Sequence, residues 1–318
     1  MMADMQMVVN AKSKLRAKQN NKLIFYSIFI AIPVLHFLIF YVYINFNSIV
    51  MAFQKYEVKD GEGLVALPAY FENFKTAWAS FVNNPLRLKN SLLFSAINIF
   101  VGTPLILMFS FYIYKKGRFS GFYRVILFLP QVLSEVVLGL MYKYLMDTAA
   151  PTIFSDIFGY TGSGLLYESK SRFAATMFFH MMMTFGTNTL IYSSTMSSIN
   201  PSLIEAAQMD GANPLQEFIY VVLPSVYATM VTMVIVCVSV VFTEQFRVFT
   251  LFEGEVGVVD NIGYYLYHQA QNSKLWNDGA AVMPYPVLAA YGLILTIITV
   301  PVSLGARYFL NKFGPKEE

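Results

Sequence analysis

The sequence has few of the residues from which catalytic and metal centres are built. Its single cysteine, Cys237, cannot form a disulfide within the chain, and its three histidines, His36, His180 and His268, stand far apart. No H-E-x-x-H helix, G-x-S-x-G elbow or cysteine-rich metal spacing occurs. The G-x-x-x-x-G-K-[ST] phosphate loop is also missing. These absences predict that the chain is not an enzyme, holds no metal or cofactor, and does not bind ATP through a P-loop.

The sequence is also poor in charged residues, and it contains several long apolar runs. Charged residues make up 13% of the chain and hydrophobic residues 56%, whereas soluble domains carry about 25% charged residues. Several runs have the roughly twenty apolar residues that a ~30 Å hydrocarbon core requires, and none alternates as a barrel strand does. The sequence therefore predicts an all-α integral membrane protein with six transmembrane helices, at 23–44, 91–114, 122–146, 173–195, 225–249 and 285–309.

Lysine and arginine gather in three flanks of these spans, which sets the expected orientation. With an even number of spans the three flanks share one side, and an excess of basic residues in short flanks marks the cytoplasm. The net charge of +3 is then a topology signal and does not indicate a nucleic-acid partner. The flanking residues are Lys12, Lys14, Arg16, Lys18 and Lys22, then Lys115, Lys116, Arg118 and Arg124, and finally Arg307, Lys312 and Lys316.

The spans divide the chain into segments. Residues 1–22 form a basic cytoplasmic segment, and 23–44 form an anchor helix that is retained, because no small-residue cleavage site follows it. Residues 45–90 form an extracytoplasmic loop, 91–310 a core of five helices, and 311–318 a cytoplasmic tail. The aromatic-rich 45–90 loop either receives a soluble partner at the membrane surface or seals the bundle as an interfacial segment.

A polar island at 200–224 separates the fourth and fifth spans. The pair Asn200–Pro201 is a helix start, and Gly211 predicts a stop in the left-handed conformation. The pair Asn213–Pro214 repeats the start signal, with Gln216 at the capping-box position, and this second helix should end before Pro224. Two short helices that meet at Gly211 expose a surface to a partner; the alternative is an ordinary helix-turn-helix linker.

The order of residues in the island carries a family resemblance. Glu205-Ala206-Ala207 is followed by Gly211 and then by Leu223-Pro224. This order resembles the EAA loop of permeases in binding-protein-dependent ABC importers, the cytoplasmic surface on which an ATPase subunit docks. The resemblance implies ATPase-coupling roles for Glu205, Ala206, Ala207, Asp210, Gly211, Ala212, Leu223 and Pro224.

Further stretches extend the resemblance over most of the chain. The run 90–95 is similar to the opening of the permease core, and 122–130 with 136–145 is similar to the third helix of carbohydrate-type members. Two departures concern the substrate: 147–151 replaces a Gly-Leu-Asn-like turn, and Glu135 occupies a stretch that is usually apolar or small. The implied fold is that of a type I ABC importer permease, an anchor helix plus a five-helix core.

Polar residues inside apolar spans mark a candidate pathway, because burying them requires a partner or a cavity. On the fourth span four of them recur at every fourth position and so share one helix face: His180, Thr184, Asn188 and Tyr192. Glu244 and Gln245 lie toward the outer half of the fifth span. Glu135 is either a third wall of the pathway or an ion-pair partner near the outer surface. The alternative for all of them is hydrogen bonding that holds the helices together.

The resemblance implies a machine of several subunits in the cell membrane, with both termini of this chain in the cytoplasm. Its partners are a second, homologous permease in a heterodimer, two ATPase subunits that bind ATP and Mg, an extracytoplasmic solute-binding protein, and membrane lipid. ATP binding would draw the docking segments together and open the cavity outward. The implied substrate is a carbohydrate such as an oligosaccharide.

Two alternatives to sugar import remain. One is an importer permease for amino acids, peptides or ions. The other is a non-transport membrane scaffold or enzyme, whose mark would be a cluster of catalytic groups at one membrane face, and no such cluster is evident in the sequence.

Overall fold

The computed structural model describes residues 22–59, 63–159, 162–252, 256–275 and 282–315. The predicted basic segment lies outside this part except for Lys22, as does Lys316 of the tail. The described helices and strands are η1 Leu38–Tyr43, α2 Ile44–Ala52, β1 Gln54–Lys59, β2 Gly63–Pro68, α3 Glu72–Val82, α4 Pro85–Ile97, η2 Asn98–Gly102, α5 Thr103–Tyr114, α6 Ser120–Val132, α7 Glu135–Tyr144, η3 Leu145–Ala149, α8 Ala150–Phe158, α9 Ser169–Ser197, α10 Pro201–Met209, α11 Pro214–Glu217, η4 Phe218–Val222, α12 Leu223–Ser225, α13 Tyr227–Ser239, α14 Val248–Leu251, η5 Gly257–Val259, α15 Ile262–Asn272 and α16 Tyr285–Phe313.

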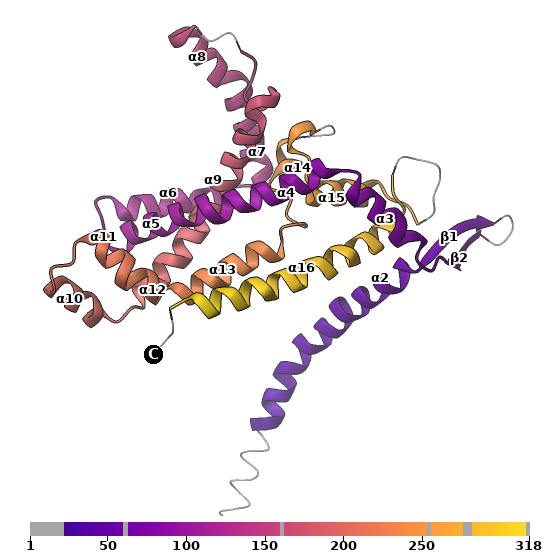
Figure 1. The fold of residues 1–318 in the computed structure, drawn as a ribbon, viewed down its shortest axis with the longest axis horizontal. Coiled ribbons are helices and arrows are strands. Elements are labelled where there is room, and N and C mark those ends of the chain that lie inside the picture. The colour runs from indigo at the N-terminus through magenta and orange to yellow at the C-terminus, as the bar shows by residue number, and fades with distance from the viewer. Residues whose placement is uncertain (1–21, 60–62, 160–161, 253–255, 276–281, 316–318) are drawn as a thin grey trace, which may run out of the picture.

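The helices form an elongated bundle with two distinct ends (Figure 1). α10, α11 and the C-terminal end of α16 lie at one end, and α3 with the β1–β2 hairpin lies at the other. α5 packs along α9, α6 also packs on α9, and α16 contacts α2, α3 and α13. Gly186 permits the α6–α9 contact, because a Cβ there would collide with the carbonyl of Leu127.

Within the described residues, three helices are long and apolar enough to cross a membrane: Lys22–Ala52, Pro85–Tyr114 and Tyr285–Phe313. The first and second are interrupted only by π turns, and both extend beyond the predicted bounds. α9 has 29 residues, which at about 1.5 Å per residue also exceeds the thickness of a bilayer core. The described chain is thus an all-helical membrane bundle apart from one hairpin.

The third and fifth predicted spans are not straight helices, and in this respect the sequence prediction was wrong. The third breaks at Leu133–Ser134, and its two halves, Ser120–Val132 and Glu135–Ile157, are bent by 103°. Pro130 lies just before this break, where its ring and missing N–H weaken the helix. If each bent helix pair counts as one span, the structure has up to 5 candidate spans; α9 as a further one is consistent with the predicted six.

The fifth predicted span ends early. α13 stops at Ser239, and the chain turns through 240–247, with Phe246 at φ 51° and Arg247 at φ 64°. Glu244 and Gln245 therefore lie in a turn. The sequence had suggested that they lie on a helix. The physical reason is long-range: Arg247 leaves the helix direction to pair with Glu135 on α7, and no local pattern encodes that partner.

A β-hairpin in the 45–90 loop was not predicted. β1 and β2 pair antiparallel with Tyr56 opposite Ala66. The Asn73 side chain on α3 holds the hairpin base by donating hydrogen bonds to the carbonyls of Ala52 (2.9 Å) and Gln54 (2.8 Å). The prediction that only helices occur was made for apolar spans, and it does not extend to this polar loop, where strand edges can meet water.

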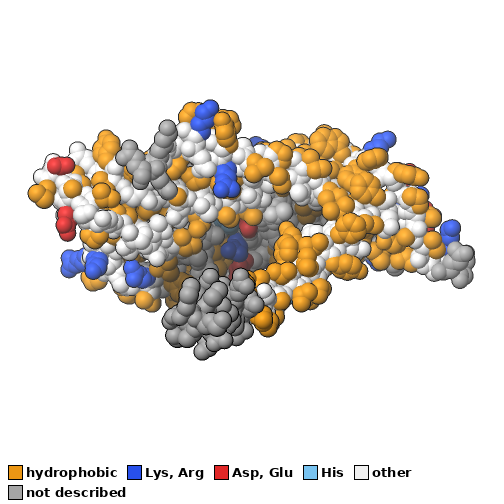
Figure 2. All heavy atoms as spheres, turned by 90° about the horizontal axis from the view of Figure 1, so that it is seen from below, with side chains coloured by type: hydrophobic (Ala, Val, Ile, Leu, Met, Phe, Trp, Pro, Cys, Tyr) orange, Lys and Arg blue, Asp and Glu red, His pale blue; other side chains and the backbone are white. Residues whose placement is uncertain are grey.

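Hydrophobic packing falls into three clusters along the bundle. One lies at the hairpin end and joins α2, α3, α15 and α16; a second joins α4, α7, α9 and the turn after α13; a third lies at the island end around α5, α9 and η4. The helix Lys22–Ala52 takes almost no part in them, since none of its most apolar window is buried. It leaves the bundle at an angle (Figure 1), and orange hydrophobic side chains are spread widely over the face seen in Figure 2.

Candidate functional site

The island at 200–224 folds as the two short helices that the sequence predicted. The Asn200 side chain accepts a hydrogen bond from the Ser202 N–H at 3.1 Å and caps α10. α10 closes in a Schellman arrangement: the Gly211 N–H bonds to the carbonyl of Gln208, and the Ala212 N–H bonds to that of Ala207. Gly211 adopts φ +82°, the left-handed conformation expected of it.

The second helix begins as predicted but ends differently. Asn213 and Gln216 form a reciprocal capping box at the start of α11. The helix does not end before Pro224, however; it continues through the π turn η4 into α12, which ends at Ser225. A π turn widens the backbone and hydrogen-bonds one residue further back. Room for the proline ring therefore exists just ahead of Pro224.

The outward face of the island is exposed and partly apolar. Glu205, Ala206, Asp210 and Gly211 are exposed, and Ala207 and Ala212 are half-buried at the joint. Large apolar side chains stand beside them at high exposure: Met209 at 88%, Tyr220 at 75% and Leu215 at 62%. Exposed apolar side chains grouped on a folded surface are typical of contact sites for protein partners. Leu223 is half-buried and Pro224 exposed at the far edge.

An ion pair that sequence reasoning missed fastens the island to the bundle. Glu217 is 2% exposed, and the Lys115 ammonium at the end of α5 lies 2.8 Å from both of its carboxylate oxygens. The Gln208 amide of α10 donates to the same carboxylate at 3.2 Å. One buried carboxylate thus joins α5, α10 and α11. The sequence showed Lys115 only as a basic flank, because its partner lies about a hundred residues away.

Between α4–α5, α9 and α13 lies a central cavity of about 180 Å³. All four members of the α9 stripe line it, and so does Glu244 from the turn after α13. Gln245 and Glu135 do not line it, so the structure separates them from the other predicted pathway residues. The lining residues are Ser95, Asn98, Thr103, Ile106, His180, Thr184, Asn188, Tyr192, Met233, Val236, Cys237, Val240, Glu244 and Phe246.

Polar atoms in this cavity lack protein partners. His180 is 3% exposed and Tyr192 2%, yet neither ring nitrogen of His180 nor the Tyr192 hydroxyl has a hydrogen-bond partner among the described residues. The Asn188 amide likewise has none within the described ranges. Buried polar groups are nearly always satisfied in folded proteins. Their side chains can therefore meet water or a polar ligand in the cavity.

Directly after Phe246 in the chain, Arg247 belongs to a charged network with residues of α7 and α14. Arg247 Nη1 lies 2.6 Å from Glu135 Oε2, and the Thr250 hydroxyl donates to Glu135 Oε1 at 2.7 Å. Of the two interpretations of Glu135, the ion-pair partner is the one whose geometry is present. Phe246 lines the cavity, and its ring centroid lies 4.9 Å from that of Phe94 and 5.1 Å from that of His180.

The cavity and the island share a buried cluster. Tyr192 lines the cavity and also packs in the cluster that contains Ile204 of α10 and Val222 of η4. Met196, one turn further along α9, is fully buried in the same cluster. One buried cluster thus includes residues of α10, η4 and the cavity wall.

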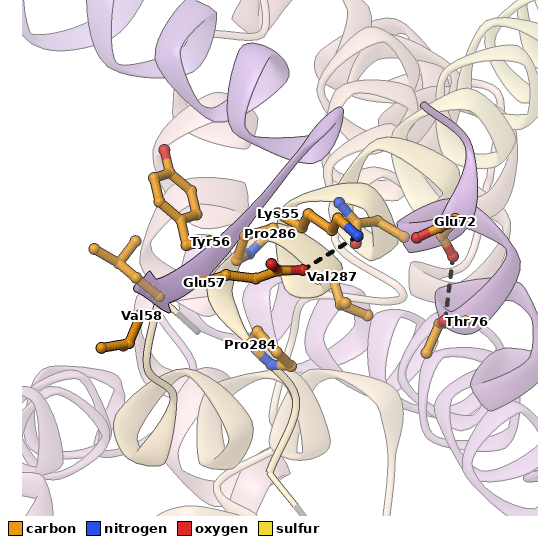
Figure 3. A pocket seen from close by; sticks show the side chains of 11 residues that line it. Lys55, Tyr56, Glu57, Val58, Glu72, Thr76, Pro284, Pro286 and Val287 are labelled. Atoms are coloured by element: carbon orange, nitrogen blue, oxygen red, sulfur yellow. Dashed lines mark hydrogen bonds and ion pairs between the residues drawn. The ribbon is translucent and has the colours of Figure 1, made fainter. Parts of the chain in front are cut away.

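A second, wider pocket of about 780 Å³ lies at the hairpin end, between β1, α3 and the start of α16 (Figure 3). Its charged groups are exposed and partly paired with each other: Lys55 Nζ lies 3.2 Å from Glu57 Oε1, with the two side chains 42% and 50% exposed. This hairpin pocket is a polar surface hollow and contains none of the predicted pathway residues.

Comparison with known proteins identifies the class. Residues 76–316, well over half of the chain, match the family described as the inner membrane component of binding-protein-dependent transport systems. The chain belongs to this family, and it is a multi-pass membrane permease of an ABC transport system.

Relatives and solved structures extend this assignment. The chain is 31% identical over 227 residues to the probable ABC transporter permease protein MG188 of Mycoplasma genitalium, covering 67% of each chain. It is 25% identical to the arabinooligosaccharides transport system permease protein AraP of Halalkalibacterium halodurans, covering 88% of this chain and 85% of that one. A bacterial ABC transporter involved in the import of the acidic polysaccharide alginate has the same fold, with a TM-score of 0.74 at 19% identity over 94% of this chain and 99% of that one.

Proposed function

We propose that this permease imports a carbohydrate, such as an oligosaccharide, delivered by an extracytoplasmic binding protein. The observation that carries the proposal is the central cavity, where the Tyr192 hydroxyl, the Asn188 amide and the His180 imidazole lack partners among the described residues. Sugar hydroxyls need donors and acceptors, and an aromatic wall such as Phe246 suits the face of a sugar ring. The relatives named for arabinooligosaccharide transport support the same substrate class.

The island is the proposed docking surface for an ATPase subunit. Its exposed apolar and acidic groups, the Ala-lined joint and the rigid caps at both helices suit a protein partner. ATP and Mg would be bound and ATP hydrolysed on two such ATPase subunits, because this chain has no phosphate loop. With one island per chain, a second homologous permease completes the transporter, and a heterodimer is the expected form.

The hairpin end is proposed to face the binding protein. A solved structure of similar fold, with a TM-score of 0.69 at 21% identity, is an alginate ABC transporter in complex with a periplasmic protein bound to an alginate pentasaccharide. The β1–β2 hairpin and α3 stand at the bundle end opposite the island (Figure 1). With the island in the cytoplasm, both termini lie there and the hairpin lies outside, as the basic flanks predict.

Coupling between the two sites would run through packed side chains. Closure of the ATPases draws the island toward its counterpart, and Ile204 and Val222 transmit this displacement to Tyr192 in the cavity wall. Such a shift switches the cavity between inward and outward access, as alternating access requires.

Uptake measurements on cavity variants test the proposal. Asn188→Ala removes one hydrogen-bond partner of a bound sugar, which typically costs about 1–3 kcal/mol, so uptake per inserted molecule should fall by roughly ten-fold. Asn45→Ala is the matched control, because the exposed Asn45 amide bonds only to its own helix, at the Tyr41 carbonyl. If Asn188 merely holds helices together, protein yield and thermal stability fall instead while uptake per molecule stays normal.

A further inference from the structure

The charges of the residues that line the central cavity affect whether neutral, cationic or anionic sugars can enter it. Glu244 is the only carboxylate among its lining residues, and no lysine or arginine lines it within the described part of the chain. The guanidinium of Arg247, which directly follows the lining residue Phe246, is paired with Glu135 at 2.6 Å. The His180 ring is 3% exposed, and burial disfavours a positive charge on it. Among the described lining residues, Glu244 is therefore the one that brings a formal charge to the cavity.

The Glu244 carboxylate has no ion-pair partner among the described residues. Its one described contact is local: Oε1 accepts the N–H of Phe246 at 3.2 Å. An ionisable group at membrane depth is costly and normally pairs with a counter-charge or faces a water-filled pathway. In a cavity with low-dielectric walls, its field is weakly screened and acts on whatever enters.

We propose that this cavity admits uncharged or positively charged saccharides and disfavours anionic ones such as uronates and sugar phosphates. The inference rests on the proposed function of the cavity as the sugar pathway, and it narrows the substrate class. The fold alone does not decide this property, because a transporter of similar fold handles the acidic polysaccharide alginate.

The chain contains its own probe of this potential. Cys237, its single cysteine, lines the same cavity, with Sγ 3.8 Å from the amide nitrogen of Asn98. Methanethiosulfonates of opposite charge react with a thiol at rates that follow their local concentrations. The ratio of the cationic rate to the anionic rate, each divided by the rate on free 2-mercaptoethanol, reports the sign of the potential beside Glu244.

The experiment uses the assembled transporter in lipid vesicles, with the cysteines of the other subunits replaced. Trimethylammonium-ethyl, sulfonatoethyl and uncharged methyl methanethiosulfonate are compared, and Cys237→Ala confirms the site of labelling. The normalised cation-to-anion ratio should exceed one by about ten-fold. Glu244→Gln, which preserves shape and removes the charge, should bring the ratio close to one. Raising the ionic strength should lower the ratio in the wild-type protein, so the test does not depend on a variant that folds.

The outcomes separate the two proposals. If the uncharged reagent modifies Cys237 but the ratio is one or below, or is unchanged by both Glu244→Gln and salt, the charge inference is overturned and the pathway stands. If the uncharged reagent reaches Cys237 in no nucleotide state, the cavity is not a pathway, and both proposals fall together.

Discussion

The island and the central cavity are built in different ways. Both helices of the island are fixed by contacts a few residues apart, such as Asn200 with Ser202 and Ala212 with Ala207. The cavity wall instead joins Asn98, Thr184 and Glu244 from separate segments of the chain. We therefore expect the island to keep its shape when the bundle moves, and the cavity to change when its helices shift. That difference suits an island that serves as a rigid contact surface and a cavity that serves as an adjustable binding site.

The largest effect is expected from a substitution that strains the backbone at the joint between the two island helices. Gly211→Val places a β-branched residue at φ +82°, which costs about 1–3 kcal/mol. Co-purification of the ATPase and substrate-stimulated ATP hydrolysis should then fall by ten-fold or more. Membrane insertion should survive, because no span is altered.

The matched control for that variant is Gly211→Asn, since asparagine tolerates the left-handed conformation. No atom lies within 4 Å of the added Cβ, so the contrast tests backbone strain and not crowding. Equal transport by the valine and asparagine variants would mean that the joint at Gly211 is not part of the docking surface.

An intermediate effect is expected where the island meets the bundle. Lys115→Met leaves the buried Glu217 without its cation. The Lys115 side chain is 32% exposed, so water compensates in part, and a loss of about 1–2 kcal/mol is expected. Melting temperature and ATPase-coupled uptake of the purified complex would both decrease.

Lys116→Met controls for the loss of one basic charge, because Lys116 is exposed and has no ion pair among the described residues. Exchanging the pair, as Lys115→Glu with Glu217→Lys, should recover part of the stability. A Lys115→Met protein that melts like the Lys116→Met protein would show that the ion pair does not fasten the island.

The smallest effect should come from Gln245, which is next to a cavity-lining residue in the sequence but does not itself line the cavity. Gln245 directly follows Glu244, yet only Glu244 lines the cavity. Gln245→Ala should leave uptake per inserted molecule within about two-fold of wild type, whereas Glu244→Ala should lower it by roughly ten-fold, as expected for a lost polar contact to substrate. Uptake lost equally in both variants would place the pathway along the whole turn.

Both helix starts of the island and the end of its first helix could be predicted residue by residue, because capping depends on a few neighbouring side chains. The π turn ahead of Pro224 could not, since the rule that a helix ends before proline is only a tendency that tertiary packing overrides. The stripe on α9 was also predictable from its spacing, and its four residues do share the cavity. That they bind a sugar stays a prediction.

The 240–247 turn shows why other features of the fold could not be predicted from the sequence. An apolar run reads the same whether it continues as a helix or turns, and the Glu135–Arg247 pair that holds the turn joins residues 112 apart. Glu217 posed the same problem, because its buried position depends on Lys115, 102 residues away. The hairpin was missed because aromatic and charged residues in a loop do not by themselves specify a strand register.

By itself the sequence determined the membrane class, the two-helix island and the polar face of α9, since each depends on composition or on residues within a few turns. Only the tertiary structure decided that the fifth span breaks, that Glu244 joins the cavity while Gln245 and Glu135 do not, and that Glu217 fastens the island to α5. These features depend on contacts between segments a hundred residues apart, and such contacts form only when the helices pack.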